Sequence, residues 1–221
     1  KPLVVVAFNG SPIDLSWAKE NASAILEAWY PGQSGGLALG NVMAGKANPA
    51  GRLPLTFYRS VSDLPPFDDY SMKGRTYRYF TGTPVYSFGY GLGYSSFEYA
   101  PVKVEAPSGQ PENGLRVSTV VKNSSTRAGE EVAELYLDPP DFEGAPRLAL
   151  RGFQRLALRP GESRAVSFDL SARDLSFVTR DGQRQLFPGK YRVTVGSGQP
   201  EAGVPFQAGE FTLERVVAVA E

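Results

Sequence analysis

The chain has 221 residues, and 23 Lys and Arg residues balance 23 Asp and Glu residues, so its formal net charge is zero. A balanced charge argues against a basic nucleic-acid-binding surface and against binding to an anionic membrane. The sequence contains no cysteine and no histidine, which excludes disulfides, thiol nucleophiles, histidine-based triads and histidine metal ligands. Any catalysis must therefore use carboxylates, lysine, tyrosine or hydroxyl groups, or groups that another polypeptide supplies.

No targeting or membrane-spanning segment is visible in the sequence. The longest apolar run, residues 3–8, is far shorter than the ~20 residues that a helix needs to cross a bilayer. The N-terminus shows neither the charged region nor the cleavage site of a signal peptide. Because Lys1-Pro2 leads directly into the apolar run, we expect the sequence to open inside a longer protein, at the edge of a strand.

Residues 1 to about 58 alternate between strand and helix patterns. The pattern predicts a strand over 3–8, a helix over 15–21, a strand over 24–29, a helix over 34–44 and a strand over 53–58. The continuous apolar run at residues 3–8 is typical of a parallel sheet that is covered on both faces. Three strands and two short helices cannot cover both faces or pair both edges, so this unit is predicted to belong to a larger α/β sheet.

Residues 60 to about 100 form a bridge that is rich in turns and aromatic side chains. The aromatic residues are Tyr70, Tyr77, Tyr79, Phe80, Tyr86, Phe88, Tyr90, Tyr94, Phe97 and Tyr99. Packing against another surface is the favoured interpretation, because each ring buries a large apolar area. A carbohydrate site is the alternative, since the faces of sugars stack on aromatic rings.

The pattern becomes all-β after a turn-forming segment at residues 107–114. Short alternating strands are predicted over 115–121, 131–137, 148–158, 164–170, 175–178, 191–195 and 210–213. About seven such strands without the Cys–Trp–Cys set predict an immunoglobulin-like or fibronectin type III-like sandwich. The predicted division is 1–100 for the α/β part with its bridge and 101–221 for the sandwich.

Three motifs that could carry chemistry are better explained by structure. The glycine-rich residues 32–36 lack the Gly-Lys-Ser/Thr ending of a phosphate loop, which favours close backbone packing. The pairs Asp68-Asp69 and Glu130-Glu131 cannot easily present two carboxylates to one substrate atom, because neighbours in a strand point to opposite faces. Solvated turns and strand edges are favoured for both pairs. No acidic cluster has the spacing of a Mg²⁺ or Ca²⁺ site, so no metal or cofactor is predicted.

Several long motifs resemble glycoside hydrolase family 3. They lie at residues 24–33, 35–36, 48–57, 63–80 and 88–97, and at residues 127–132 and 158–163 of the predicted sandwich. The stretch 63–80 is similar to members that act as β-glucosidases and β-xylosidases. Gly93 stands where the family more often has serine. The resemblance covers nearly the whole chain, with its motifs in the right order.

The resemblance implies a C-terminal portion of an enzyme with a (β/α)8 barrel, an α/β sandwich and a fibronectin type III-like domain. It implies a retaining mechanism with two carboxyl groups about 5–5.5 Å apart, one a nucleophile and the other an acid/base. In the family, the nucleophilic Asp lies on the barrel and the acid/base Glu on a loop before the strand that begins here at Leu3. Both are expected in the missing part. Glu27 matches neither role, so no catalytic residue is assigned to this chain.

The predicted function is hydrolysis of terminal β-D-glucosyl residues of short oligosaccharides or glycosides, as part of a complete enzyme. An exo-β-xylosidase and a non-catalytic carbohydrate-binding or scaffolding module are the alternatives. The expected partners are a β-linked gluco- or xylo-oligosaccharide and the missing barrel and sandwich half, in the same polypeptide or in a companion chain. A homo-oligomer is left open, and the family suggests a periplasmic or secreted location.

Arg75 and Tyr77 are the best candidates for contact with a sugar. Arginine offers a rigid fork of hydrogen-bond donors, and tyrosine offers a ring with a polar tip. Structural packing is the favoured alternative for both, because this stretch must also lead the chain out of the sheet.

Overall fold

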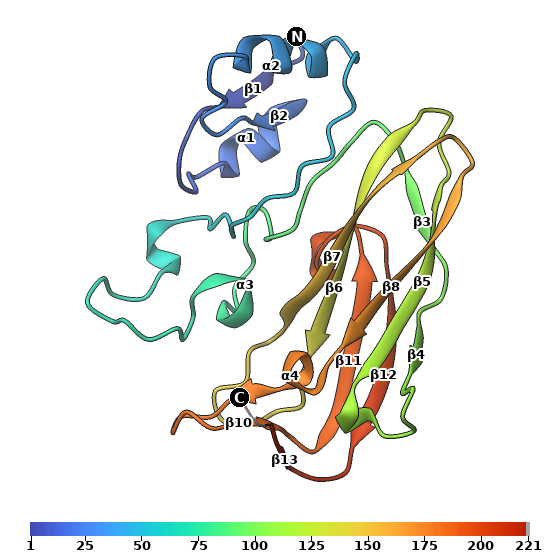
Figure 1. The fold of residues 1–221 in the computed structure, drawn as a ribbon. Helices are drawn as coiled ribbons and strands as arrows, with labels where there is room; N and C mark the ends of the chain where they lie inside the picture. The colour runs from blue at the N-terminus through green and yellow to red at the C-terminus, as the bar shows by residue number, and fades with distance from the viewer. Residues whose placement is uncertain (220–221) are drawn as a thin grey trace.

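The computed structural model describes residues 1–219, in which an α/β part lies beside a larger β-sandwich (Figure 1). The α/β part contains β1 (Val4–Ala7), α1 (Ser16–Asn21), β2 (Ala24–Glu27) and α2 (Gly35–Met43). β1 and β2 pair in parallel, with Val4 opposite Ala24 and Ala7 opposite Glu27. These elements confirm the predicted strands and helices of residues 1–44. Among residues 1–219, no helix has the length and apolar character needed to cross a membrane.

The strand predicted over residues 53–58 is wrong. Phe57 forms only an isolated antiparallel bridge with Tyr86, and the N–H of Leu53 donates to the Tyr90 carbonyl at 2.9 Å. Pro54 cannot donate to a sheet ladder and fixes its own φ, so this segment could not continue as a central strand. Residues 53–57 instead hold the bridge against the α/β part.

The bridge contains η1 (Val61–Asp63) and α3 (Thr76–Tyr79), and many of its rings pack on one another. Tyr77 stacks on Phe88 with ring centroids 4.3 Å apart, and Tyr86 stacks on Tyr90 at 5.1 Å. These contacts agree with the favoured packing interpretation. Tyr70 differs, because its side chain is 90% exposed.

Two four-stranded sheets and one small sheet form the all-β part, which confirms the predicted sandwich. The first sheet has the order β12-β11-β6-β7, the second joins β3, β5 and β4 with β8 beside β5, and the small sheet has the order β13-β10-β9. The strands are β3 (Phe97–Tyr99), β4 (Lys103–Glu105), β5 (Leu115–Asn123), β6 (Gly129–Asp138), β7 (Ala149–Leu158), β8 (Ser163–Leu170), β9 (Phe177–Val178), β10 (Arg184–Leu186), β11 (Gly189–Gly196), β12 (Phe206–Leu213) and β13 (Val217–Ala218), and the short helices are η2 (Pro111–Asn113), α4 (Ala172–Leu175) and η3 (Pro200–Ala202).

The strand predicted over 175–178 shrinks to β9, because a capping box starts α4 just before it. The Ser171 side chain accepts from the N–H of Asp174, and the Asp174 carboxylate accepts from the N–H of Ser171. β3, β4, β10 and β13 were missed. Each has two or three residues, which is too short for an alternating pattern to be recognised.

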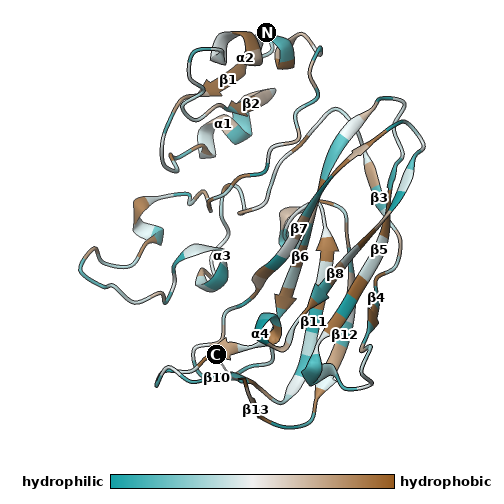
Figure 2. Ribbon diagram, viewed as in Figure 1, coloured by the Kyte–Doolittle hydropathy of each residue, from teal (hydrophilic) through white to brown (hydrophobic). Residues whose placement is uncertain are grey.

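The sandwich holds most of the buried apolar residues. Polar and apolar residues alternate along its strands (Figure 2), and β5 buries Leu115, Val117 and Val121 on one face. Its core cluster also includes Leu135 and Val193, both fully buried. This inward alternation is what lets two sheets pack face to face.

The α/β part has a much smaller core. Its buried cluster is Leu15, Ala18, Phe57 and Val85, with Trp29 and a few other side chains packed against it. Several large apolar side chains of this part remain exposed, namely Phe8, Trp17, Tyr30, Leu37 and Met43. The buried apolar area per residue is therefore far lower here than in the sandwich, which predicts lower local stability.

Limited proteolysis of the isolated chain 1–221 should reveal this difference. We expect a resistant core that begins near residues 100–114, with residues 1–60 digested first, because a small core opens at a low free-energy cost. Mass spectrometry of the fragments over time measures the order of cleavage. Equal resistance of both parts would contradict the expectation.

Candidate functional site

A buried ion pair joins the α/β part to the sandwich. Nη2 of Arg52 donates to Oε2 of Glu131 at 3.0 Å, and the two side chains are 10% and 1% exposed. Nε of Arg52 donates to the Ser197 carbonyl at 3.1 Å. The Tyr99 hydroxyl donates to Oε1 of Glu131 at 2.7 Å, so both carboxylate oxygens have partners. Glu131 was expected to be solvated. That expectation is wrong, because residues 52, 99 and 197 enclose it.

Glu134, three residues further along β6, is buried against the bridge. The Tyr136 hydroxyl donates to its Oε2 at 2.6 Å, and Gly89 of the bridge lies directly above. A Cβ atom at Gly89 would lie 2.3 Å from this oxygen, and Gly89 has a φ of +79°, so only glycine fits there. Burial raises the pKa of Glu134 to about 7, although the Tyr136 hydrogen bond and the charge of Arg52 lower it.

These two carboxylates do not form a catalytic pair. A carboxyl group with a raised pKa often marks an active site. However, Glu131 and Glu134 are 1% and 4% exposed, both oxygens of Glu131 have partners, and Oε2 of Glu134 accepts from Tyr136. A glycosidic oxygen could not reach them without separating the two parts of the chain. Their arrangement supports a structural role at the domain contact.

The structure places the two predicted sugar contacts in different surroundings. The guanidinium of Arg75 donates to the backbone carbonyls of Pro66, Asp69 and Ser71, so this side chain organises the loop before it. The Tyr77 hydroxyl accepts from the N–H of Leu150 at 3.1 Å, at the contact with the sandwich. A role of either residue in sugar binding stays a prediction.

Glu27 occupies the last position of β2. Its Oε1 accepts from the N–H of Trp29 at 3.4 Å, and burial raises its pKa. Trp29 has a φ of 51°, which is rare for a bulky residue. The Glu27 carboxylate thus contacts the turn that leaves the sheet, and we assign it no catalytic role. Within residues 1–219, no group of three or more Asp and Glu residues could hold a metal ion.

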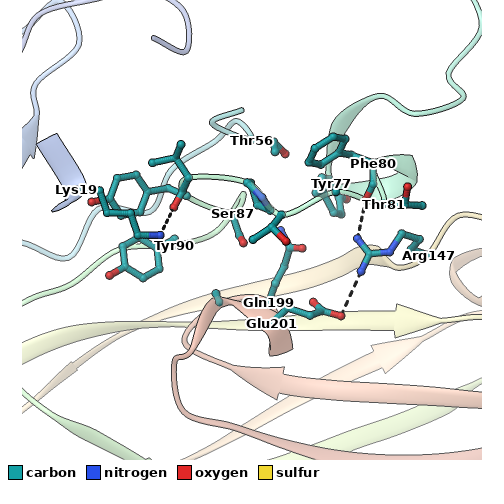
Figure 3. Close-up of a pocket in the computed structure, with 16 residues that line it drawn as sticks. Lys19, Thr56, Tyr77, Phe80, Thr81, Ser87, Tyr90, Arg147, Gln199 and Glu201 are labelled. Carbon is teal, nitrogen blue, oxygen red and sulfur yellow. Dashed lines mark hydrogen bonds and ion pairs between the residues drawn. The ribbon is translucent and has the colours of Figure 1, made fainter. Parts of the chain in front are cut away.

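A cavity of about 420 Å³ lies between the α/β part, the bridge and the sandwich (Figure 3). It is lined by Lys19, Thr56, Tyr77, residues 80–87, Tyr90, Arg147, Gln199, Glu201 and Ala202. The sequence offered no signal for this site, because its walls come from segments that are far apart in the chain. Tyr77 is the one predicted contact that faces it.

The charged side chains around the cavity already have partners. Nζ of Lys19 donates to the Val85 carbonyl at 2.6 Å. Nη1 of Arg147 donates to the Phe80 carbonyl at 2.8 Å, and its Nη2 lies 3.4 Å from Oε1 of Glu201 (Figure 3). Two cationic side chains and one carboxylate therefore border the cavity, and backbone carbonyls hold both cations in place.

Comparisons with known proteins agree with this architecture. Residues 1–94 match the glycosyl hydrolase family 3 C-terminal domain, and residues 131–199 match the fibronectin type III-like domain. A xylan 1,4-beta-xylosidase of Xylanibacter ruminicola is 38% identical over 198 residues, which are 89% of this chain and 23% of that protein. A periplasmic beta-glucosidase of Salmonella typhimurium is 36% identical over 209 residues, covering 89% of this chain and 27% of that protein. The chain spans about a quarter of the length of these curated relatives.

Solved structures show the same fold over the whole chain. Beta-glucosidase 3B from Thermotoga neapolitana, in complex with α-D-glucose, matches 100% of this chain with 32% of its own, at a TM-score of 0.88 and 30% identity. A β-glucosidase from Erythrobacter marinus matches 95% of this chain with 28% of its own, at a TM-score of 0.80 and 36% identity. These matches place the chain among the C-terminal domains of glycoside hydrolases. It belongs to glycoside hydrolase family 3, which confirms the resemblance seen in the motifs.

The raised pKa of Glu134 predicts a pH-dependent stability. The unfolded chain titrates near the ordinary value of 4.5 and the folded chain near 7, so the folded state holds more protons between these values. Stability should therefore fall as the pH rises from about 5 to about 8, by up to about 3 kcal/mol from this group. Urea unfolding of the wild type and Glu134→Gln at several pH values measures the difference.

Glu134→Gln should lose this part of the pH dependence, because an amide can still accept from Tyr136 but does not titrate. Glu98→Gln is the matched control, since Glu98 is exposed on β3. If Glu134→Gln and the wild type lose the same stability over this range, Glu134 is already charged in the folded state.

The contacts of Arg75 predict a local effect on its loop. Arg75→Ala removes hydrogen bonds to three carbonyls, each worth about 1 kcal/mol, so amide hydrogen exchange in residues 66–72 should accelerate about a hundredfold. Lys73→Ala, at an exposed position of the same region, should leave exchange unchanged. Unchanged exchange in Arg75→Ala, together with a lower kcat/KM of the complete polypeptide, would point to sugar binding instead.

Proposed function

We propose that this chain is a C-terminal portion of a retaining exo-β-glycosidase that hydrolyses terminal β-D-glucosyl residues of short oligosaccharides or glycosides. Residues 1–100 are proposed to complete an α/β sandwich domain, and residues 101–221 to form the fibronectin type III-like domain. β3 pairs with β5, so the second sheet of the sandwich already includes residues 97–99. Hydrolysis of β-xylosides is the second candidate, because relatives named as β-xylosidases match as well as those named as β-glucosidases.

The enclosure of the buried carboxylates supports the proposal that the catalytic carboxylates lie outside this chain. A retaining glycosidase needs two carboxyl groups about 5–5.5 Å apart on either side of the scissile bond. The deeply buried carboxylates, Glu131 and Glu134, are enclosed at the domain contact. Glu27 contacts the turn at Trp29. We propose that a barrel and further sandwich strands of the same polypeptide supply the nucleophile and the acid/base.

The relative from Salmonella typhimurium is named a periplasmic β-glucosidase, which supports a periplasmic or secreted location for this protein. A non-catalytic carbohydrate-binding or scaffolding module is the alternative from another functional class. The presence of a hydrolytic partner region in the same gene distinguishes the two hypotheses.

Hydrolysis assays with the chain and with the complete polypeptide test the proposal. Chain 1–221 alone should not hydrolyse p-nitrophenyl β-glucoside or β-xyloside, whereas the complete polypeptide should turn over the glucoside at roughly 1–10³ s⁻¹. Higher kcat/KM with the xyloside would select the second candidate.

Two results would contradict the proposal. Turnover by chain 1–221 alone would place catalytic carboxylates within it, and Glu27→Gln would be the first variant to assay. A complete polypeptide that hydrolyses neither substrate would leave the carbohydrate-binding module as the better hypothesis.

A further inference from the structure

We propose that Arg78, Arg151 and Arg184 form a binding site for a small oxyanion, a carboxylate or a phosphate group. The three arginines come from α3, β7 and β10, which are far apart in the sequence. The inference goes beyond the proposed hydrolysis and does not rest on it. It is carried by the convergence of the three side chains and by the lack of a carboxylate partner for any of them within residues 1–219.

Backbone contacts between α3 and the start of β7 bring Arg78 and Arg151 together. The N–H of Arg147 donates to the Arg78 carbonyl at 2.7 Å, and the N–H of Leu150 donates to the Tyr77 hydroxyl at 3.1 Å. Arg151 follows Leu150 directly in the chain. The side chains of Arg78 and Arg151 therefore start from neighbouring segments of backbone.

Ser176 brings Arg151 and Arg184 together. Nη2 of Arg151 donates to the Ser176 carbonyl at 3.1 Å, and Nη1 of Arg184 donates to Oγ of Ser176 at 3.2 Å. Ser176 is 1% exposed, and its hydroxyl donates to the Arg173 carbonyl at 2.7 Å. The guanidinium of Arg151 also lies over the Phe177 ring, 4.8 Å from its centroid. Two of the three guanidinium groups are thus held in defined positions, as a preorganised site requires.

The protein leaves the positive charge of this cluster unbalanced. No carboxylate oxygen of residues 1–219 lies within 4.0 Å of the three guanidinium groups. Nε of Arg78 and Nε of Arg151 are buried without a hydrogen-bond partner. Burial and the charge of Arg78 lower the pKa of Arg151, and the charge of Arg184 adds to this effect. Like charges in a half-buried position cost free energy, and a bound anion would offset that cost.

The nearby carboxylate of Asp174 is committed elsewhere, whereas part of each guanidinium is free. Oδ2 of Asp174 accepts from the N–H and the hydroxyl of Ser171 at 2.8 and 2.6 Å, in the capping box of α4. The buried Nε atoms cannot reach a ligand. The terminal nitrogens of Arg78, Nη1 of Arg151 and Nη2 of Arg184 are neither buried nor hydrogen-bonded in the part of the chain that the structure describes. These nitrogens are the donors that we assign to the ligand.

The donor set determines the class of ligand. Guanidinium groups bind carboxylate and phosphate oxygens through parallel, charge-assisted hydrogen bonds, and they offer no acceptor. A cation would be repelled, and a neutral ligand would leave the repulsion among the three arginines uncompensated. A small oxyanion with two or more oxygens satisfies several of the free donors and balances the charge.

Calorimetric titration of chain 1–221 with inorganic phosphate and with malonate, in a low-salt Tris buffer, tests the proposal. We expect at least one of the two to bind with a Kd below about 1 mM, and the tighter one shows which oxyanion the site prefers. Arg78→Gln should weaken this binding at least about tenfold, the effect of one lost hydrogen bond to a charged group. Because the Arg78 side chain has no protein partner to lose, this variant should unfold in urea at the wild-type midpoint or above it when phosphate and malonate are absent.

Two further variants complete the test. Arg151→Lys keeps the charge but loses the planar fork, so it should also weaken binding. Arg159→Gln is the matched control, because Arg159 is exposed in the turn that follows the other end of β7, and it should bind as the wild type does. The proposal is overturned if neither anion binds to the folded chain, or if Arg78→Gln and Arg151→Lys bind as tightly as Arg159→Gln. Hydrolysis does not enter these measurements, so their failure would leave the proposed glycosidase function untouched.

Discussion

The buried ion pair between Arg52 and Glu131 is the contact on which the arrangement of the two parts depends. Removing one partner of such a pair leaves an uncompensated buried charge and typically costs about 3–5 kcal/mol. The backbone around Arg52 is equally constrained. A Cβ atom at Gly91 would lie 2.2 Å from the Gly51 carbonyl oxygen, so these two loops can approach only because Gly91 has no side chain. The serine that the family more often has in place of Gly93 would meet the Pro49 carbonyl in the present backbone, since a Cβ there would lie 2.5 Å from that oxygen.

The contact between the α/β part and the sandwich also gives Glu131 and Glu134 of β6 different surroundings. Glu131 receives the guanidinium of Arg52 and a tyrosine hydroxyl. Glu134 receives a hydroxyl from Tyr136 and is covered by Gly89, so desolvation dominates and its pKa rises. The bridge that covers Glu134 also forms one side of the cavity, where Tyr77 contacts both the sandwich and the open space. Stability at the domain contact and the shape of the cavity therefore depend on the same segment.

The sequence pattern predicted a strand or helix correctly where the pattern lies within one short segment. The apolar run at residues 3–8, the small residues of α2 and the alternation along β5 and β11 all predicted the correct elements. The prediction over residues 53–58 failed because Leu53 and Phe57 pair with Tyr90 and Tyr86 of the bridge, and an apolar run does not reveal its partner. Glu131 was assigned to solvent for a similar reason, since Arg52 lies 79 residues away in the sequence.

The sequence by itself determined the family, through several long motifs in order, and the succession of an α/β part and a β-sandwich, through the periodicity of apolar residues. It also excluded cysteine and histidine chemistry, because those side chains are absent. Only the tertiary structure decided that Arg75 organises its own loop, that Glu131 and Glu134 are buried, and that Lys19, Thr56 and Arg147 border one cavity. Periodicity is a local property that a few residues encode, whereas burial and cavities arise where distant segments meet, and their positions depend on the packing of the whole chain.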